Sequence, residues 1–401
     1  MAVPVRFLHC ADLHLGSRFV GISDSDPELA ERMMSASYDA LENIVATANR
    51  EAVDFVVIAG DIFDSSSETP YSRSRFADAV SRIHSPVYIA YGNHDYARKW
   101  EDSIPLPKNA FVFGPEVTTF RFPSDDSPQV AIHGFSYSKR QTESRVRDFE
   151  GIPGLLNIGV MHAEVDGPAD SPYAPCRSSD LEGKGIDYWA LGHIHKGGVV
   201  SQEPMAVYPG TPQGRNVKES GPKGAYLVSC SDAGIKADFV KMSVIDWIDV
   251  DATIGPDTVL TDLTEKVKEA AEPGSIVRMT VEGSGPLNTP LRTERNDILE
   301  LIEKDSGCSV SEFIVRTRPE FDLDSRSKAG DFTAAVIEYG SGLSSTLSRD
   351  QIIDRICSTN ASQSIRPILE AMSSDELRGL VDDSIAYIVE KMLEAETDED
   401  N

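Results

Sequence analysis

The chain has few of the features that mark secreted or membrane proteins. Its five cysteines are odd in number and widely scattered, without a C-x-x-C pair, which indicates reduced thiols rather than a disulfide framework. No apolar run reaches the roughly eighteen residues that suggest a transmembrane helix. The N-terminus lacks the basic segment, long apolar segment and small-residue cleavage site of a signal peptide. We therefore expect a cytoplasmic protein with no membrane contact.

Positive charge is scarce as well: 38 lysines and arginines face 65 aspartates and glutamates, which gives a formal net charge of −27. A chain this acidic repels nucleic acid as a whole. Local basic spots nevertheless occur at Lys139, Arg140, Arg145 and Arg147, and at Arg215, Lys218 and Lys223. Because an acidic balance also suits a saline habitat or a basic partner surface, composition alone leaves nucleic-acid binding open.

The length and the apolar pattern indicate more than one domain. A chain of 401 residues is long enough for two or three. Apolar strands at 5–10, 54–60 and 87–91 alternate with amphipathic helices at 27–50 and 70–83, which implies parallel pairing with right-handed crossovers. Short strands follow at 117–122, 129–134, 157–162, 187–191, 205–208, 224–230 and 235–242. Residues 1–245 therefore predict one α/β domain with a mixed sheet or a pair of stacked sheets.

Two smaller regions follow in the chain. Strands at 246–252, 275–281 and 310–318 alternate with helices at 258–271 and 290–304, which predicts a compact βαβαβ domain over 246–324. Residues 325–401 are predicted to be helical and to end in a frayed acidic tail. The helix at 375–394 carries an apolar stripe made of Leu377, Leu380, Val381, Ile385, Ile388, Val389 and Met392. We expect this stripe to dock on another chain, because no core-forming element is evident after residue 328 for it to cover; burial within its own domain is the alternative.

Five short segments place Asp, His or Asn directly after a predicted strand. They are Asp12-Leu13-His14, Gly60-Asp61-Ile62-Phe63-Asp64, Gly92-Asn93-His94-Asp95, Met161-His162 and Gly192-His193-Ile194-His195. Side chains at strand ends of an α/β sheet converge on one crevice. Carboxylate, amide and imidazole groups without thiolate are typical ligands of divalent metals of intermediate hardness. The sequence therefore predicts a metal site at this edge.

Local geometry supports the same interpretation. The i, i+2 spacing of Asp12 with His14, and of His193 with His195, puts both side chains of each pair on one side of an extended segment. A glycine before three of the ligands is consistent with sharp turns. Each motif alone is more often a turn or a structural histidine, as we expect for His9, His84 and His133. The prediction depends on all five occurring together, in order, at strand ends.

This set resembles the calcineurin-like metallophosphoesterase superfamily, whose motifs run D-x-H, G-D-x-x-D/H, G-N-H-D/E, H and G-H-x-H. The resemblance covers about residues 1–215 and implies a four-layer α/β sandwich of mixed sheets flanked by helices. It implies two divalent ions, with Asp61 bridging between them. The ligand set carried over is Asp12, His14, Asp61 and His195 for one ion and Asp61, Asn93, His162 and His193 for the other. His94 is implied to face the scissile phosphate and to assist the transition state or leaving group.

General chemistry agrees with these roles. Two cations ~3.5–4 Å apart clamp the attacking and leaving oxygens of a phosphoryl displacement and acidify the attacking water. A bridging carboxylate offsets the repulsion between the ions, while the neutral amide of Asn93 leaves net positive charge for the phosphate. An imidazole such as that of His94 changes protonation near neutral pH, as a general acid must.

A narrower resemblance is to the DNA-repair branch of the superfamily, the double-strand-break nucleases, which in bacteria includes the SbcD nuclease subunit. It is carried by the opening 7–16 and by Tyr208-Pro209-Gly210-Thr211-Pro212-Gln213-Gly214-Arg215. The branch implies a small capping domain and C-terminal helices that dock on an SMC-like, SbcC-like coiled-coil ATPase, and it leaves a homodimer open. Arg215 and Asp64 become candidate substrate-binding residues. Archaeal and eukaryotic members have His where this chain has Asp64, so an auxiliary role for that His does not carry over.

The leading hypothesis is a DNA exonuclease or endonuclease in DNA repair. It would depend on manganese, with iron, zinc or magnesium as alternative metals. A small-molecule or cyclic-nucleotide phosphodiesterase is the first alternative, favoured by the acidic charge. A non-catalytic scaffold is a different class of function, and the complete ligand set argues against it.

Overall fold

The computed structural model describes residues 4–17, 27–64, 68–319, 323–359 and 362–399. The chain divides into two compact units, residues 1–249 with 271–278 and residues 250–270 with 279–401. The predicted division into three domains at 245 and 324 stays a prediction.

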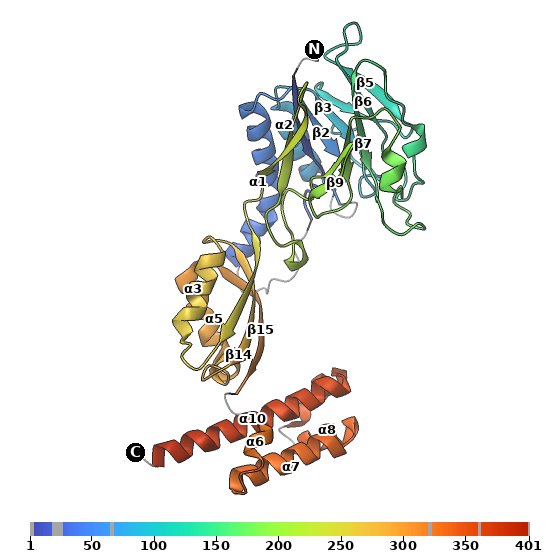
Figure 1. Cartoon of the computed structure of the whole chain (residues 1–401). Coiled ribbons are helices and arrows are strands. Elements are labelled where there is room, and N and C mark those ends of the chain that lie inside the picture. Colours follow the sequence, from blue (N-terminus) through green and yellow to red (C-terminus); the bar gives the residue numbers. More distant parts are fainter. Residues whose placement is uncertain (1–3, 18–26, 65–67, 320–322, 360–361, 400–401) are drawn as a thin grey trace. The chain divides into compact units, whose positions relative to one another are not determined.

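Two six-stranded mixed sheets form the first unit (Figure 1). One sheet has the order β12 (Gly234–Lys241), β11 (Gly224–Ser231), β1 (Val5–Cys10), β2 (Phe55–Ala59), β3 (Val87–Ala90) and β4 (Ala110–Val112). The other has the order β5 (Thr118–Phe122), β6 (Val130–Gly134), β7 (Leu156–His162), β8 (Tyr188–Gly192), β10 (Met205–Tyr208) and β9 (Gly198–Gln202). Strands β1 to β4 run parallel, as do β6, β7, β8 and β10.

The alternation of side chains along the strands builds the layers. Phe7 and Phe55 face the second sheet, where the Phe7 ring lies 5.3 Å from that of Tyr188 between centroids. Leu8 and Val56 point the other way, because successive side chains of a strand alternate between faces. They pack under the helices α1 (Pro27–Arg50) and α2 (Pro70–Ser81).

Loops cover the outer face of the second sheet. They carry the 3₁₀ helices η1 (Val146–Asp148) and η2 (Ser178–Leu181), and they pack over the buried Trp189 and Phe149. A third 3₁₀ helix, η3 (Val217–Glu219), follows β10. The predicted class of stacked mixed sheets flanked by helices is confirmed. The short strands β4 and β9 were not predicted.

A three-stranded sheet of order β13 (Trp247–Ile254), β14 (Ile276–Ser284) and β15 (Ser309–Arg318) follows in the chain. Its helices are α3 (Leu260–Ala270), α4 (Pro290–Thr293) and α5 (Arg295–Ser306). The single helix predicted over 290–304 is therefore wrong: the backbone leaves helical geometry at Glu294, with φ −113° and ψ 24°.

The C-terminal part is helical, with α6 (Leu323–Arg326), α7 (Phe332–Thr346), α8 (Arg349–Ile356), η4 (Ser362–Ile365), α9 (Arg366–Ala371) and α10 (Ser374–Glu399). The acidic tail is helical as far as Glu399, so its described part is not frayed as predicted.

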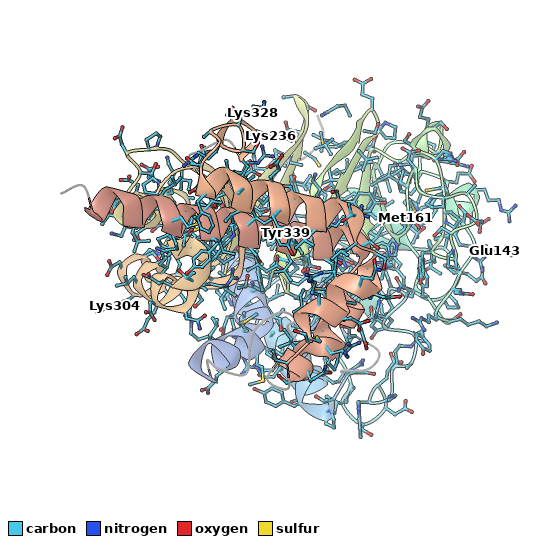
Figure 2. The ribbon with its side chains drawn as sticks, turned by 90° about the horizontal axis from the view of Figure 1, so that it is seen from below. Glu143, Met161, Lys236, Lys304, Lys328 and Tyr339 are labelled. Atoms are coloured by element: carbon cyan, nitrogen blue, oxygen red, sulfur yellow. The ribbon has the colours of Figure 1, made fainter. Side chains whose placement is uncertain are left out.

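The apolar stripe of α10 is divided between two environments. Leu377 packs with α8 and α9, whereas Ile385 and Val389 pack with Ile337 of α7. The expectation that no element was available for the stripe to cover is therefore wrong. Leu380 and Ile388 remain 40% and 48% exposed. Tyr339 of α7, which is labelled in Figure 2, is 64% exposed.

Among the helices that the structure describes, none is long and apolar enough to cross a membrane. The five cysteines all lie in the described ranges, where each is buried and free of a disulfide.

Candidate metal centre

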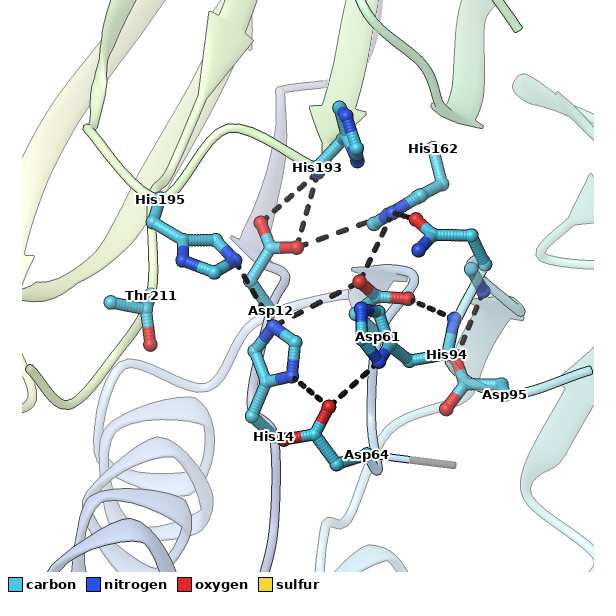
Figure 3. A network of polar contacts seen from close by, with 12 residues as sticks. Asp12, His14, Asp61, Asp64, His94, Asp95, His162, His193, His195 and Thr211 are labelled. Atoms are coloured by element: carbon cyan, nitrogen blue, oxygen red, sulfur yellow. Dashed lines mark hydrogen bonds and ion pairs between the residues drawn. The ribbon is translucent and has the colours of Figure 1, made fainter. Parts of the chain in front are cut away.

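The carboxyl ends of parallel strands from both sheets bring the predicted site residues together (Figure 3). Asp12 and His14 follow β1, Asp61 and Asp64 follow β2, and Asn93 and His94 follow β3; His162 ends β7, while His193 and His195 follow β8. Three groups have potential ligand atoms within 4.8 Å of one another: Asp12 with His14 and His195, Asp12 with Asp61 and His162, and His14 with Asp64 and His94.

The backbone at the site is left-handed at four predicted ligands. Eight described non-glycine residues have positive φ, and they include Asp12 (53°), His14 (45°), Asp61 (50°) and His193 (104°). Such conformations cost of order ~1–3 kcal/mol each and gather at functional sites. The predicted extended geometry for the two i, i+2 pairs is therefore wrong. Left-handed turns, not a pleated segment, direct these side chains inward.

Three glycines are required because neighbouring atoms come too close for a side chain. A Cβ on Gly92 would lie 2.2 Å from Asp61 Oδ1, and one on Gly60 would lie 2.4 Å from His162 Nδ1. A Cβ on Gly192 would lie 1.8 Å from the Ala59 carbonyl oxygen. Only Gly60 of the three also has positive φ, at 93°. Close approach of the two sheets explains Gly60 and Gly192, and close packing against the Asp61 loop of the same sheet explains Gly92.

The first group centres on two imidazoles that face each other. His14 Nε2 and His195 Nε2 lie 3.1 Å apart. The Nδ1–H of His195 donates to Glu219 at 2.8 Å, so its Nε2 presents a lone pair. His14 Nδ1 is buried without a hydrogen bond and lies 3.6 Å from Asp64 Oδ1. A proton on each Nδ1 leaves both Nε2 lone pairs available to one cation.

The second group is an electron-rich cluster around His162. Its Nδ1–H donates to the Ala59 carbonyl at 3.0 Å, while Nε2 lies 2.9 Å from Asn93 Oδ1 and 3.3 Å from Asp61 Oδ2. Burial disfavours a charged ring, but the Asp61 and Asp12 carboxylates outweigh it and raise the pKa of His162 to about 9. This cluster therefore demands a positive charge at Nε2, which a divalent cation would supply.

Asp61 lies between the two groups. Its Oδ2 is 3.3 Å from His162 Nε2 and 3.8 Å from His14 Nε2, and its Oδ1 accepts from the backbone N–H of His94 at 2.9 Å. Asp12, and not Asp61, is shared by both groups, but the His162 nitrogen that Asp12 approaches is Nδ1, at 3.9 Å. The Nδ1 of His162 donates to a carbonyl and is therefore not open to a metal. Asp61 is the carboxylate that faces open Nε2 atoms in both groups, those of His162 and His14.

His193 is the predicted ligand with the least support from the geometry. Its backbone N–H donates to both oxygens of Asp12 at 3.1 Å, and these are the His193 interactions drawn in Figure 3. Its ring packs against His162 and Tyr173, at centroid distances of 5.1 and 4.9 Å. Burial lowers the pKa of His193 to about 3, which keeps the ring neutral and able to bind a metal.

His94 is held by Asp64. The Nδ1 of His94 lies 2.7 Å from Asp64 Oδ1, and this hydrogen bond raises the pKa of the imidazole. The Asp64 carboxylate also accepts from Ser17 Oγ. The His94 side chain is 35% exposed, so an imidazolium oriented by Asp64 can reach a substrate outside the ligand cluster. Asp64 thus contacts His94 and His14, whereas the sequence suggested it for substrate binding.

Two residues with a clear place at the site were missed by the sequence-based interpretation. Buried Asp95 accepts backbone N–H bonds from Ile62, Phe63 and Gly92, at 3.2, 2.9 and 2.9 Å, and so joins two ligand-bearing loops. Its place beside His94 in the motif that follows β3 was the signal in the sequence. No sequence pattern marked Glu219, whose carboxylate accepts a hydrogen bond from His195. Arg215, the other candidate for substrate binding, donates to Glu219 at 2.8 Å.

Fold and site together define a metallophosphoesterase. Residues 5–197 match the family described as calcineurin-like phosphoesterase, and the chain belongs to that family. The uncharacterized metallophosphoesterase YhaO of Bacillus subtilis (strain 168) is 33% identical over 303 residues, which cover 71% of this chain and 74% of YhaO.

Two further similarities are more distant. The DNA double-strand break repair protein Mre11 of Halobacterium salinarum is 26% identical over 343 residues, 79% of each chain. A solved dimetal phosphatase of Danio rerio matches 59% of this chain and 96% of its own, with 15% identity and a TM-score of 0.37.

Proposed function

We propose that this chain is a two-metal phosphodiesterase that hydrolyses DNA, with manganese as its metal, and that it acts as a nuclease in DNA repair. The observation that carries the two-metal part is the position of Asp61 Oδ2 between His162 Nε2 and His14 Nε2, at 3.3 and 3.8 Å. One carboxylate oxygen between two available imidazole nitrogens is the arrangement that a bridged pair of cations requires.

Each ion is assigned its own ligands. Asp12, His14 and His195 would hold the first with Asp61, and Asn93, His162 and His193 would hold the second with Asp61. Carboxylate, amide and imidazole ligands suit manganese, and they also suit iron or zinc. When bound, the two ions polarise the phosphoryl oxygens and acidify the attacking water.

His94 provides the proton. Its ring is fixed through Nδ1 by Asp64 at 2.7 Å, which leaves Nε2 as the edge that meets the substrate. Since this hydrogen bond raises the pKa of His94, the ring keeps its proton to a higher pH than a free imidazole and can donate it to the leaving oxygen. The same charge stabilises the developing negative charge.

DNA is the favoured substrate because the chain is similar over most of its length to proteins named for double-strand break repair. The exposed apolar side chains of the C-terminal helices, among them Leu380 and Ile388, support docking on a coiled-coil ATPase or pairing with a second copy. The five cysteines are buried and outside disulfides, which suits a reducing compartment such as the cytoplasm. The net charge of −27 favours the second candidate, a phosphodiesterase for small molecules or cyclic nucleotides.

The deciding experiment is a paired assay of the full chain with manganese. Linear duplex DNA, a 2′,3′-cyclic nucleotide and bis(p-nitrophenyl) phosphate are offered separately, with Asp61→Ala protein as the control for contaminating nuclease. Cleavage of DNA by the wild type and not by the variant supports the proposal. Hydrolysis of the cyclic nucleotide with intact DNA would establish the second candidate. No hydrolysis of any ester by protein that binds manganese would contradict both.

A further inference from the structure

Glu219 lies in no motif that would predict a functional residue. It ends η3, 24 residues after His195, and is 7% exposed. Its Oε1 accepts from His195 Nδ1 and from Arg215 Nη2, both at 2.8 Å. Its Oε2 accepts from the backbone N–H and from Nε of Arg215, at 2.8 and 3.3 Å. Among the described residues, this carboxylate thus accepts hydrogen bonds from a ligand histidine and from Arg215.

Arg215 continues the network to the other side of the site. Its Nη1 lies 3.9 Å from Asp64 Oδ2, and the other oxygen of Asp64 lies 2.7 Å from His94 Nδ1. The Arg215 side chain is 13% exposed, which leaves little of it to meet a substrate. A continuous chain of contacts therefore joins His195, Glu219, Arg215, Asp64 and His94 without passing through the ligand atoms of the metal centre.

The charges in this chain depend on one another. Glu219 is buried, and its carboxylate lies 2.8 Å from Arg215 Nη2. A buried carboxylate is stable only when paired, and Arg215 is the full positive charge placed between Glu219 and Asp64. Removal of the guanidinium would leave two carboxylates facing the rings of His195 and His94 with less compensation.

We propose that Glu219 and Arg215 are positioning residues: Glu219 fixes the His195 tautomer that presents Nε2 to a metal ion, and Arg215 ties this support to the Asp64–His94 pair. The inference rests on the proposed two-metal site. It gives Arg215 a role inside the protein instead of the substrate contact suggested by the sequence. The two roles differ in what a substitution of Arg215 changes: metal affinity and turnover in one case, substrate affinity in the other.

The test measures manganese binding by calorimetry and steady-state hydrolysis of bis(p-nitrophenyl) phosphate for the full chain and its variants. Removal of a group that orients a metal ligand commonly costs ~10–100-fold in metal affinity or activity. We expect Glu219→Ala to weaken one of the two ions by this factor and to leave the other unchanged. Glu219→Gln keeps an acceptor for the His195 N–H, so it should lie between wild type and Glu219→Ala, and it serves if the alanine variant does not fold.

Arg215→Ala should lower kcat with little change in KM. In the double variant with Glu219→Ala, kcat should fall by less than the product of the two single-variant effects, because the two residues act as one unit. Arg82→Ala is the matched control. Arg82 follows α2 and also pairs with a carboxylate through two nitrogens, at 2.7 Å each to Glu42 of α1. Its removal should change neither measurement.

Three outcomes overturn the inference. If the Glu219→Ala variant bound manganese as tightly as the wild type, Glu219 would not be a positioning residue, and the proposed two-metal function would be unaffected. A raised KM in Arg215→Ala with unchanged kcat and metal affinity would make Arg215 a substrate contact. Wild-type protein that binds no pair of ions would overturn the proposed function and this inference together, so the two failures are distinguishable.

Discussion

Asp61 is the residue on which both proposed metal positions depend. It faces His162 Nε2 at 3.3 Å and His14 Nε2 at 3.8 Å, so we expect Asp61→Ala to lose most of both ions and nearly all activity. Asn93→Ala removes one neutral ligand and should weaken the second ion alone. Elemental analysis of the purified variants gives the number of ions per chain. Two ions retained by Asp61→Ala would refute the bridging assignment.

His94 should behave differently from the ligands around it. Because its ring is held by Asp64 and lies 35% exposed, we expect His94→Ala to keep both metals and the fold. Its turnover should fall by about 100-fold or more, as is typical when a general acid or a charge-stabilising group is lost. Activity and metal content are measured on the same sample. Loss of metal in proportion to activity would show that His94 is a ligand.

Residue patterns predicted the side chains at strand ends but not those that support them. Asp12, Asp61 and His162 could be named because a motif and the end of a strand coincide. The contact of Glu219 with His195 depends on how residues 196–218 turn back to the site, and no local pattern encodes that path. The left-handed backbone at Asp12 and His14 was also hidden, since polar residues after a strand suit both extended and turned conformations.

At the scale of the elements, the two sheets approach each other closely beside the site. A Cβ on Gly192 of β8 would lie 1.8 Å from the Ala59 carbonyl oxygen of β2, so Gly192→Ala must push the strand ends apart. We expect a loss of about 2–3 kcal/mol of unfolding free energy, and weaker metal binding because His162 and His193 move.

The matched control is Gly198→Ala on the edge strand β9, where a Cβ would meet nothing within 4 Å. It should be neutral or slightly stabilising, within about 1 kcal/mol. Denaturant unfolding of both variants makes the comparison. Equal stability of the two would mean that the close approach of β2 and β8 is relieved at no cost.

His9 of β1 joins the two sheets through Tyr188 OH at 2.9 Å and the Leu191 carbonyl at 3.2 Å. Burial lowers the pKa of His9 from 6.5 to about 3, so between these values the unfolded chain binds a proton that the folded chain does not. The contribution of His9 to stability is therefore complete above pH 6.5 and is lost as pH falls toward 3, by about 1.4 kcal/mol per pH unit.

Denaturant unfolding from pH 5 to pH 8 can isolate this effect as the difference between wild type and His9→Gln. The stability advantage of the wild type should shrink below pH 6.5. Exposed His84 provides the control, since His84→Gln should leave the pH dependence of the wild type unchanged. A constant difference between wild type and His9→Gln would contradict a neutral, buried His9.

Periodicity predicted elements better than it predicted their surroundings. The helix α1 begins and ends at the predicted residues 27 and 50. The break between α4 and α5 was missed because apolar spacing continues across Glu294. For α10, the period of 3.6 marked an apolar face, but periodicity cannot say what covers it; α7 and α8 cover one part of that face.

On the scale of the whole molecule, charge restricts where DNA could bind. The predicted basic spot near residue 140 lines an open hollow of ≈ 690 Å³ that also contains Glu143, Asp148 and Asp170. Arg145 is paired with Glu116 at 2.6 Å. This spot is therefore partly neutralised. Under the proposed function, bound metal ions would add positive charge for a phosphate backbone.

The helical segment after residue 327 should be separable from the catalytic unit. The buried side chains of α10 pack on α7, α8 and α9, which a truncation after residue 327 removes together with it. Truncation would break the side-chain hydrogen bonds from Asn288 and Thr289 to Glu390 and the one from Arg326 to Asp331. We therefore expect residues 1–327 to stay folded and monomeric and to hydrolyse bis(p-nitrophenyl) phosphate at the rate of the full chain.

The same truncation tests the proposed partner. It removes the exposed apolar side chains Leu380, Tyr387 and Ile388, so a coiled-coil ATPase that forms a complex with the full chain in gel filtration should fail to bind residues 1–327. Leu380→Asp in the full chain is the finer variant, because it adds charge to the exposed face and leaves buried Leu377 and Val389 in place. A truncated protein that aggregates would show that the helices complete this chain's own core. A stable truncated protein that still binds the ATPase would move the docking surface elsewhere.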